Sequence, residues 1–169
     1  MSSYIYDISY ECIEMGADKL EIDIDEESAN DLLSITVSNN VNWRLAYNPS
    51  RKPTNTVPML HQVCDLCGGR LNIKHTEAGS KLTACMQYRN ADRPAMGSAP
   101  ALIQELIMLK PDIDLTYVHR IDGREYRLSS PEIKSMLDGV PLDAPSASQW
   151  LKEKIGEGLI GILRERDSP

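Results

Sequence analysis

The stretch "KLEIDIDEESANDLLSITVSNN" (residues 19–40) decides the fold that the sequence predicts. Apolar and polar residues alternate strictly at both of its ends, and this period of two is typical of strands with one buried face. The apolar positions are Leu20, Ile22, Ile24, Leu33, Ile35 and Val37. The polar, turn-rich segment "EESAND" separates the two runs, so we expect two neighbouring antiparallel strands.

The segments on either side of this pair extend the pattern. Apolar residues recur every three or four positions over residues 4–16, which predicts a helix on the N-terminal side. On the C-terminal side we expect a loop over 39–56, then a helix from Thr56 that Gly68 and Gly69 end. Two further alternating runs, "RLNIKHT" and "KLTACMQY", predict another pair of strands.

The remaining part of the chain is expected to extend this unit. A helix is expected over 99–109, and the two runs around Asp122-Gly123 predict a hairpin over 113–128. A short helix follows, with a capping box from Ser129 to Glu132. The last helix is expected over about 146–165. The residues that it is expected to bury are Trp150, Leu151, Ile155, Leu159 and Leu163.

Together these elements predict an α/β fold, a two-layer sandwich in which helices cover one face of a mixed β-sheet. We divide the chain into a first domain over 1–90 and a C-terminal extension over 91–169 that packs on it, built as helix, hairpin, helix and helix. The 169 residues are enough for such a core.

Charge and composition narrow the functional classes. The net charge is -7, which argues against general binding to nucleic acid or to anionic membranes. No apolar run approaches the length of a membrane span, and the N-terminal segment has neither the basic nor the apolar region of a secretory signal. The four cysteines form no dense disulfide pattern. We therefore expect a cytoplasmic protein.

Three segments resemble the motifs of the histidine-kinase-like (GHKL, or Bergerat) ATPases. "YDISYECIEMGADKLEIDI" resembles the first motif, "ITVSNN" the second, and "CGGRLNI" with "EAGSKLTACM" the closing part of the domain. The match spans about residues 4–88. The resemblance implies the fold described above and a site for ATP and magnesium. The residues that it places there are Glu11, Asn39, Asn40, Thr54, Thr56 and Ser80.

The same segments depart from the family where its nucleotide is held. Glu11 replaces the magnesium-binding asparagine of the family, and Asn39 replaces the aspartate that recognises adenine. Val41 and Trp43 replace glycines that let the backbone approach the nucleotide. The Gly-x-Gly that binds phosphate is missing from "TNTVPML" (54–60), and the loop before it is shorter than the family's lid.

These departures predict a pseudo-ATPase, a fold kept without its catalysis. We expect no cofactor, with ATP and magnesium bound weakly at most. The alternative is an ATP-binding sensor or kinase-like regulator, in which Asn39 and Ser80 recognise adenine and Glu11 holds the metal. The degenerate ATPase and kinase motifs favour a protein without enzymatic activity.

The tail resembles a narrower group within the family. "RPAMGS", "KPDIDLTYVHRIDGREYRL" and "DGVPLDAP" are similar to the C-terminal extension of small anaerobic bacterial ATP-binding proteins, encoded near iron-only hydrogenase and NADH-oxidising subunits. This resemblance implies a regulatory or scaffold subunit with a protein partner, such as a subunit of a redox complex; a homodimer is also compatible. Trp43 is the candidate partner contact, and packing into the vacated pocket is its other expected role.

The cysteines and histidines leave one more class open. Cys64-x-x-Cys67 has the spacing of one half of a metal site, for which Cys12, Cys85, His61 and His75 are the available partners. A single pair on a helix face is more typical of core packing, so a cysteine-ligated metal protein is only a second alternative. His119 has no nucleophile beside it in the predicted hairpin, which favours a structural role.

Overall fold

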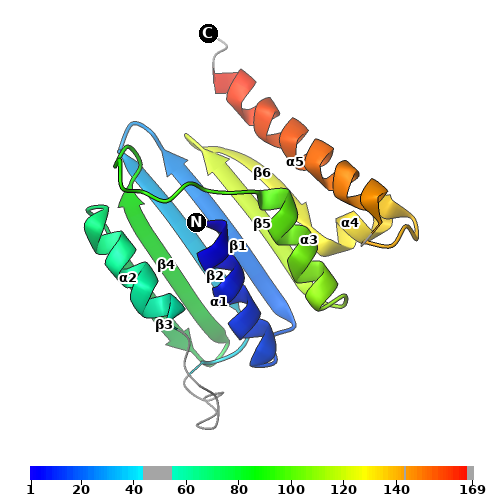
Figure 1. The fold of residues 1–169 in the computed structure, drawn as a ribbon, viewed down its shortest axis with the longest axis horizontal. Coiled ribbons are helices and arrows are strands. Elements are labelled where there is room, and N and C mark those ends of the chain that lie inside the picture. The colour runs from blue at the N-terminus through cyan, green and yellow to red at the C-terminus, as the bar shows by residue number, and fades with distance from the viewer. Residues whose placement is uncertain (44–54, 143, 167–169) are drawn as a thin grey trace.

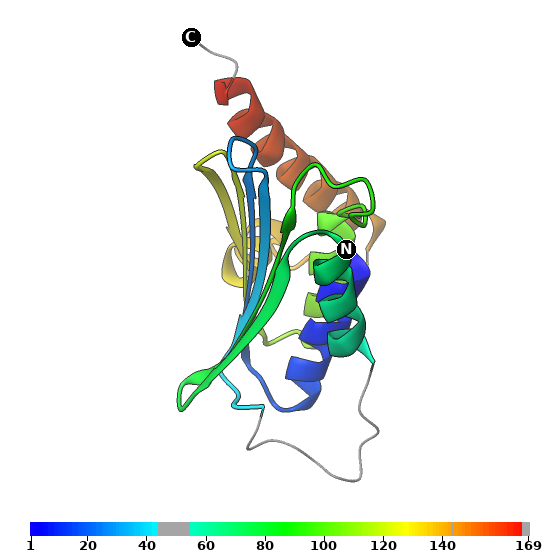
Figure 2. The same cartoon turned by 90° about the vertical axis from the view of Figure 1, so that its left-hand side faces the viewer.

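The computed structural model describes residues 1–43, 55–142 and 144–166. A six-stranded sheet has the order β3-β4-β2-β1-β5-β6. Figure 1 shows helices α1, α2 and α3 side by side across it, and the view along the sheet in Figure 2 places these helices and α5 on one side. This arrangement confirms the predicted α/β class, with a mixed sheet covered by helices on one face.

The central pair is the one that the alternating sequence predicts. Strands β1 (Lys19–Glu27) and β2 (Leu32–Asn39) are antiparallel, with Leu20 opposite Asn39. The alternating apolar residues of both strands are buried under the helices, while the other positions, apart from the half-buried Leu32, carry polar side chains on the other face. Because side chains alternate with a period of two, burying these apolar residues sets the register of the pair.

The helices of the first half pack their apolar faces on this pair and on its neighbours. Helix α1 (Ser2–Glu14) buries Ile5, Ile8 and Cys12, and α2 (Thr56–Leu66) buries Leu60 and Cys64. Strands β3 (Arg70–Thr76) and β4 (Gly79–Gln87) complete this half, and β4 pairs with β2.

Gly79 explains how β4 comes so close to the end of β2. Its φ is +143°, and a Cβ atom there would lie 1.9 Å from the backbone oxygen of Asn39. Only glycine permits this approach. The approach brings the next residue, Ser80, opposite Asn39 in the sheet.

The extension continues the same sheet. After α3 (Ala99–Leu109), strand β5 (Asp114–Ile121) runs parallel to β1, and β6 (Arg124–Ser129) returns antiparallel to β5. The hairpin turn has positive φ at Asp122 (49°) and Gly123 (83°), as the Asp-Gly pair predicts.

The last two helices pack against this hairpin and against α3. Helix α4 (Ser130–Leu137) begins with the predicted capping box, and α5 (Pro145–Arg166) lies against α3 and β6. Leu151 and Ile155 of α5 are buried as expected. Trp150 and Leu159, which were also expected to be buried, are half-buried. Leu163 was expected to be buried and is 39% exposed, whereas Ile162 beside it is 8% exposed. The C-terminal end of α5 projects beyond the sheet (Figure 1), so it is covered less completely than the rest of the helix. Within the described residues, no helix combines the length and apolar character required to cross a membrane.

Candidate functional site

The end of β2 carries the residues that the sequence predicts for nucleotide recognition. Asn39 is buried there, and both ends of its amide are engaged within the chain. Its Nδ2 group donates to the Cys12 sulfur at 3.3 Å and to the Ser80 carbonyl at 3.4 Å. Its Oδ1 atom accepts from the Val41 N–H at 2.8 Å. The side chain of Asn39 thus binds three groups of its own protein.

Ser80 is the second of these residues, and its hydroxyl is engaged as well. It is 3% exposed, and its Oγ accepts a hydrogen bond from the backbone N–H of Trp43 at 3.0 Å. His75 Nδ1 lies 3.0 Å from the same oxygen. The Trp43 and His75 rings meet edge to face, with 5.9 Å between their centroids. Ser80 therefore ties Trp43 and His75 to the start of β4.

Trp43 packs against the core beside these residues. Its side chain is half-buried, and its indole nitrogen is buried without a hydrogen bond of normal geometry among the described residues. Burial raises the pKa of the Cys12 thiol to about 12. The indole N–H of Trp43 is close enough to Cys12 to lower that pKa, but its effect is smaller than that of burial. The plugging role expected of Trp43 agrees with this packing, while its role toward a partner stays a prediction.

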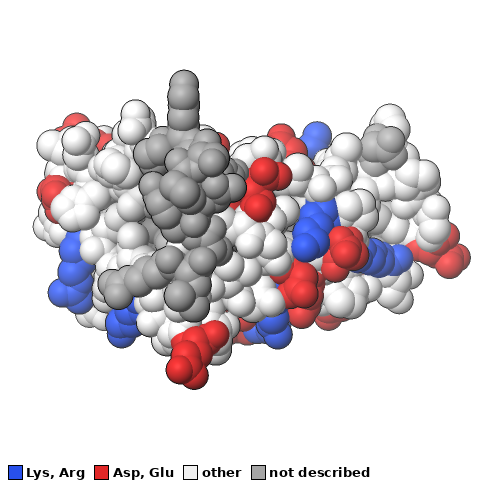
Figure 3. All heavy atoms as spheres, turned by 90° about the horizontal axis from the view of Figure 1, so that it is seen from below, with Lys and Arg blue, Asp and Glu red and all other residues white. Residues whose placement is uncertain are grey.

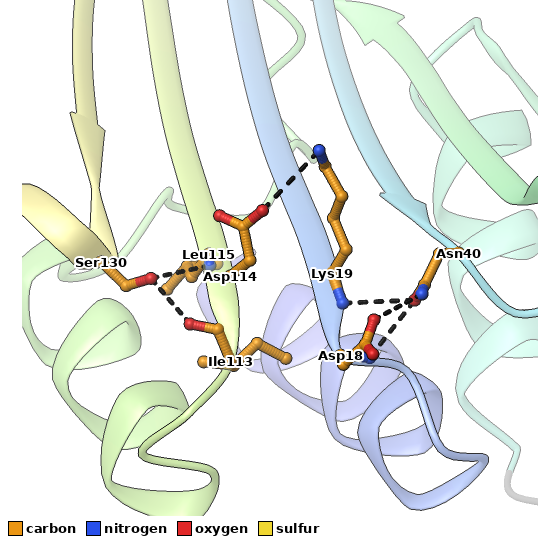
Figure 4. A network of polar contacts seen from close by, with 7 residues as sticks. All are labelled: Asp18, Lys19, Asn40, Ile113, Asp114, Leu115 and Ser130. Atoms are coloured by element: carbon orange, nitrogen blue, oxygen red, sulfur yellow. Dashed lines mark hydrogen bonds and ion pairs between the residues drawn. The ribbon is translucent and has the colours of Figure 1, made fainter.

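Asn40 is turned toward β1 and makes a structural clamp (Figure 4). Its Oδ1 accepts from the backbone N–H groups of Asp18 and Lys19, at 3.2 Å each, and its Nδ2 donates to the Asp18 carboxylate. The Lys19 ammonium in turn lies 3.7 Å from Asp114, at the start of β5. Asn40 therefore fixes the beginning of β1.

The other three residues predicted for the nucleotide site are Glu11, Thr56 and Thr54. Glu11 is half-buried on α1, and its charge contributes to raising the pKa of Cys12. Thr56 is buried as the first residue of α2. Thr54 lies outside the described residues. Of the six predicted residues, the structure joins Asn39 and Ser80 by a hydrogen bond.

Cys12 and His75 belong to this cluster, and the sequence did not single them out for it. The sequence contained one weak indication for both residues, which was their position on a face expected to be buried. Cys12 follows Ile8 by four residues on the apolar side of α1, and His75 alternates with Leu71 and Ile73 along β3. Periodicity indicated that they point inward, but it could not indicate what they contact there.

The cysteines proposed as half of a metal site lie in the core. Cys64 and Cys67 are both 0% exposed, as a packing role predicts. Burial raises the pKa of the Cys64 thiol to about 11 and also raises that of Cys67, which opposes formation of the thiolate that binds metal. The described parts of the chain contain no group of three or more His, Cys, Asp or Glu side chains placed to hold a metal ion.

The molecular surface around this end of β2 carries charges of both signs. Figure 3 shows acidic and basic side chains interspersed beside the undescribed residues 44–54. The visible described residues form no continuous basic patch there. Such a mixture does not favour a polyphosphate over other ligands.

The arrangement defines a two-layer α/β protein in which a tryptophan and an asparagine occupy the end of the central strand pair. No model of a known family matches the chain, and no curated protein matches its sequence. Among the solved structures that match it is the ATPase domain of MutL from Aquifex aeolicus, complexed with ADP. The TM-score is 0.48 at 13% identity, over 82% of this chain and 68% of that chain. At this identity the likeness concerns the path of the chain alone.

Proposed function

We propose that this protein is a non-catalytic pseudo-ATPase that acts as a regulatory or scaffold subunit through contact with another protein. The observation that carries the proposal is the engagement of the buried Asn39 side chain, which donates both amide hydrogens to Cys12 and Ser80 and accepts from Val41. A ligand would have to reach a side chain that is only 8% exposed and displace these neighbours, and a buried group that loses its partner costs about 1–3 kcal/mol.

The position of Trp43 supports the same conclusion. Its backbone N–H holds Ser80 Oγ, so the second group expected to recognise adenine is also engaged. The indole packs on the core where the family places flexible glycines. Both features fit a pocket closed from within.

The outer face of α2 supports a role in protein contact. Met59 is 50% exposed and Leu66 is 72% exposed, with half-buried Val63 between them on the same side of the helix. Residues at spacings of three and four form one stripe on a helix, and this stripe is apolar. The partner class, a subunit of a hydrogenase or an NADH-dependent redox complex, rests on the resemblance of residues 92–160.

The loss of nucleotide binding has a direct test. In calorimetry with tens of micromolar protein, we expect no saturable heat on titration with magnesium-ATP, because the groups expected to recognise adenine are bound within the chain. The protein must be shown by circular dichroism to be folded in the same buffer. A dissociation constant near one micromolar would contradict the proposal and support the ATP-binding sensor.

The role in protein contact is tested by co-purification from the native host, with mass spectrometry to identify what is retained. We expect the wild-type chain to retain a stoichiometric partner and Leu66→Glu to lose it, because a carboxylate in the α2 stripe opposes burial against an apolar surface. The matched control is Met136→Glu on α4, since Met136 is also exposed, at 58%. If both variants retain the partner equally, the α2 stripe is not the contact.

A further inference from the structure

A cavity of about 230 Å3 lies away from the cluster around Asn39. It opens to solvent and is lined by the beginnings of α1 and α3, the segment before α3, the later parts of β1 and β5, and Leu159 of α5. Most of its wall is apolar. The apolar residues of the wall are Ile5, Ile24, Met96, Ala99, Pro100, Leu102 and Leu159, and its polar side is formed by Glu26, Tyr117 and His119 with Ser2 and Ser98.

The cavity is separate from the predicted nucleotide site. Asn39 pairs with Leu20 near the beginning of β1, whereas Glu26 lies six residues further along the same strand. At about 3.3 Å per residue, these positions are on the order of 20 Å apart. The pseudo-ATPase interpretation makes no use of this end of the sheet.

Two buried side chains, Tyr117 and His119, and the half-buried Glu26 form a hydrogen-bonded array in the cavity wall. His119 Nε2 lies 2.9 Å from Glu26 Oε1, and His119 Nδ1 lies 3.0 Å from the Tyr117 hydroxyl. Tyr117 is 1% exposed and His119 is 7% exposed. The parallel pairing of β1 with β5 brings Glu26 to His119 across 93 positions of sequence.

The array has a defined polarity. The hydrogen bond from His119 holds the pKa of Glu26 below its usual range, so Glu26 is a carboxylate. A carboxylate accepts hydrogen bonds, so Nε2 of His119 donates to Glu26, while Nδ1 of His119 shares its hydrogen bond with the Tyr117 hydroxyl. The Glu26 carboxylate and the Tyr117 hydroxyl are therefore acceptor groups among the residues that line this otherwise apolar wall.

We propose that this cavity binds a small uncharged molecule, one aromatic ring carrying a single hydroxyl or N–H group, with the ring among Ile24, Leu102 and Leu159 and the donor directed at Glu26 and Tyr117. The size fits, since an apolar cavity of about 150 Å3 accommodates benzene. The composition fits as well, since small-molecule sites combine apolar walls with few polar groups.

The charges around Glu26 select against ionic ligands. An anion would meet the Glu26 carboxylate, and the described residues that line the wall include no lysine or arginine to compensate for it. A cation would compete with His119, Tyr88 and Arg93, which already lower the pKa of the same carboxylate. A neutral donor adds a hydrogen bond without burying a further charge, which is the least costly arrangement in an apolar cavity.

Phenol and toluene form a matched pair of probes, because a hydroxyl replaces a methyl group of similar size. We expect phenol to bind wild-type protein with a dissociation constant of about 1 mM or tighter in an NMR titration, and toluene to bind at least about tenfold more weakly. The amide resonances that shift should include those of Leu102, Tyr117 and His119. Equal affinity for the two probes would refute the role of the polar array.

Two variants on α5 test whether phenol binds in this cavity. Leu159→Phe fills the cavity and should weaken phenol binding at least about tenfold, while Leu163→Phe, four residues away at an exposed position, should leave it within about twofold. If Leu159→Phe does not fold, the wild-type shift map decides the question. The proposal is overturned if phenol does not bind, if Leu159→Phe binds it normally, or if the shifts cluster around Asn39.

Discussion

Replacing Asn39 with aspartate should lower the free energy of unfolding by about 3 kcal/mol at pH 7, although aspartate is the residue of the ATPase motif that this segment resembles. The amide of Asn39 donates to the Cys12 sulfur and to the Ser80 carbonyl. An aspartate cannot donate in its ionised form, so it would place a charge against two acceptors in a site that is only 8% exposed. The Val41 N–H would remain as a donor to the carboxylate, and removing one partner of a buried charge typically costs about 3–5 kcal/mol, so we expect the lower end of this range.

The destabilisation caused by Asn39→Asp should increase as the pH rises. Burial would raise the pKa of the introduced carboxyl group in the folded state above its value in the unfolded chain. The destabilisation relative to wild type is therefore smallest when the carboxyl is protonated in both states, below about pH 4, and grows as the pH rises through the folded-state pKa. Urea unfolding of both proteins between about pH 4 and pH 8 measures this difference.

Asn40→Asp is the matched control for this substitution. Its side-chain oxygen accepts from the backbone N–H groups of Asp18 and Lys19, and a carboxylate can continue to do so. The bond to the Asp18 side chain is lost and two carboxylates then face each other, but at an exposed position where solvent screens them, so we expect a cost of about 1 kcal/mol. If Asn39→Asp is as stable as wild type, the site can accept a carboxylate and is not closed.

The second large effect is expected at Trp43. Trp43→Ala should lower the free energy of unfolding by about 3 kcal/mol, at the lower end of the range for a large aromatic side chain because the indole is half-buried. The substitution removes its packing against the core and its edge contact with His75. Chemical denaturation followed by circular dichroism measures the change independently of tryptophan fluorescence.

Trp43→Phe separates packing from hydrogen bonding. Phenylalanine keeps most of the apolar volume and removes an indole N–H that is buried without a normal hydrogen bond, so we expect a cost of about 1 kcal/mol or less. In a Trp150→Phe background, acrylamide should quench Trp43 poorly. Free quenching together with an unchanged stability of Trp43→Ala would instead identify Trp43 as an exposed partner contact.

The elements of the fold were largely predictable from the sequence because their signals are local. Strand β2 and helix α3 have the bounds that alternation and helical spacing predict. The Ser129–Glu132 capping box is formed as the sequence indicates. Each of these features depends on residues within a few positions of one another, so no knowledge of distant segments was needed.

The candidate site was predictable only in part. Asn39 and Ser80 were expected at one site, and they pair directly. The sequence did not show that they use Cys12 and Trp43 as partners. The same sequence is compatible with an asparagine that faces a ligand and with one that binds its own protein. The exposure of Leu163 was missed for a similar reason: periodicity identifies an apolar face and leaves open whether the sheet extends beneath it.

The sequence by itself determined the strands, the helices and the faces that they bury, because hydrophobic periodicity and helix caps act over one or two turns of chain. The tertiary structure alone decided that β5 pairs parallel with β1, a pairing that requires the crossover through α3. That pairing assembles Glu26, His119 and Tyr117 at one wall of a cavity. A hydrogen bond between residues 93 positions apart leaves no pattern in the local sequence, because it forms only when the sheet brings the two residues together.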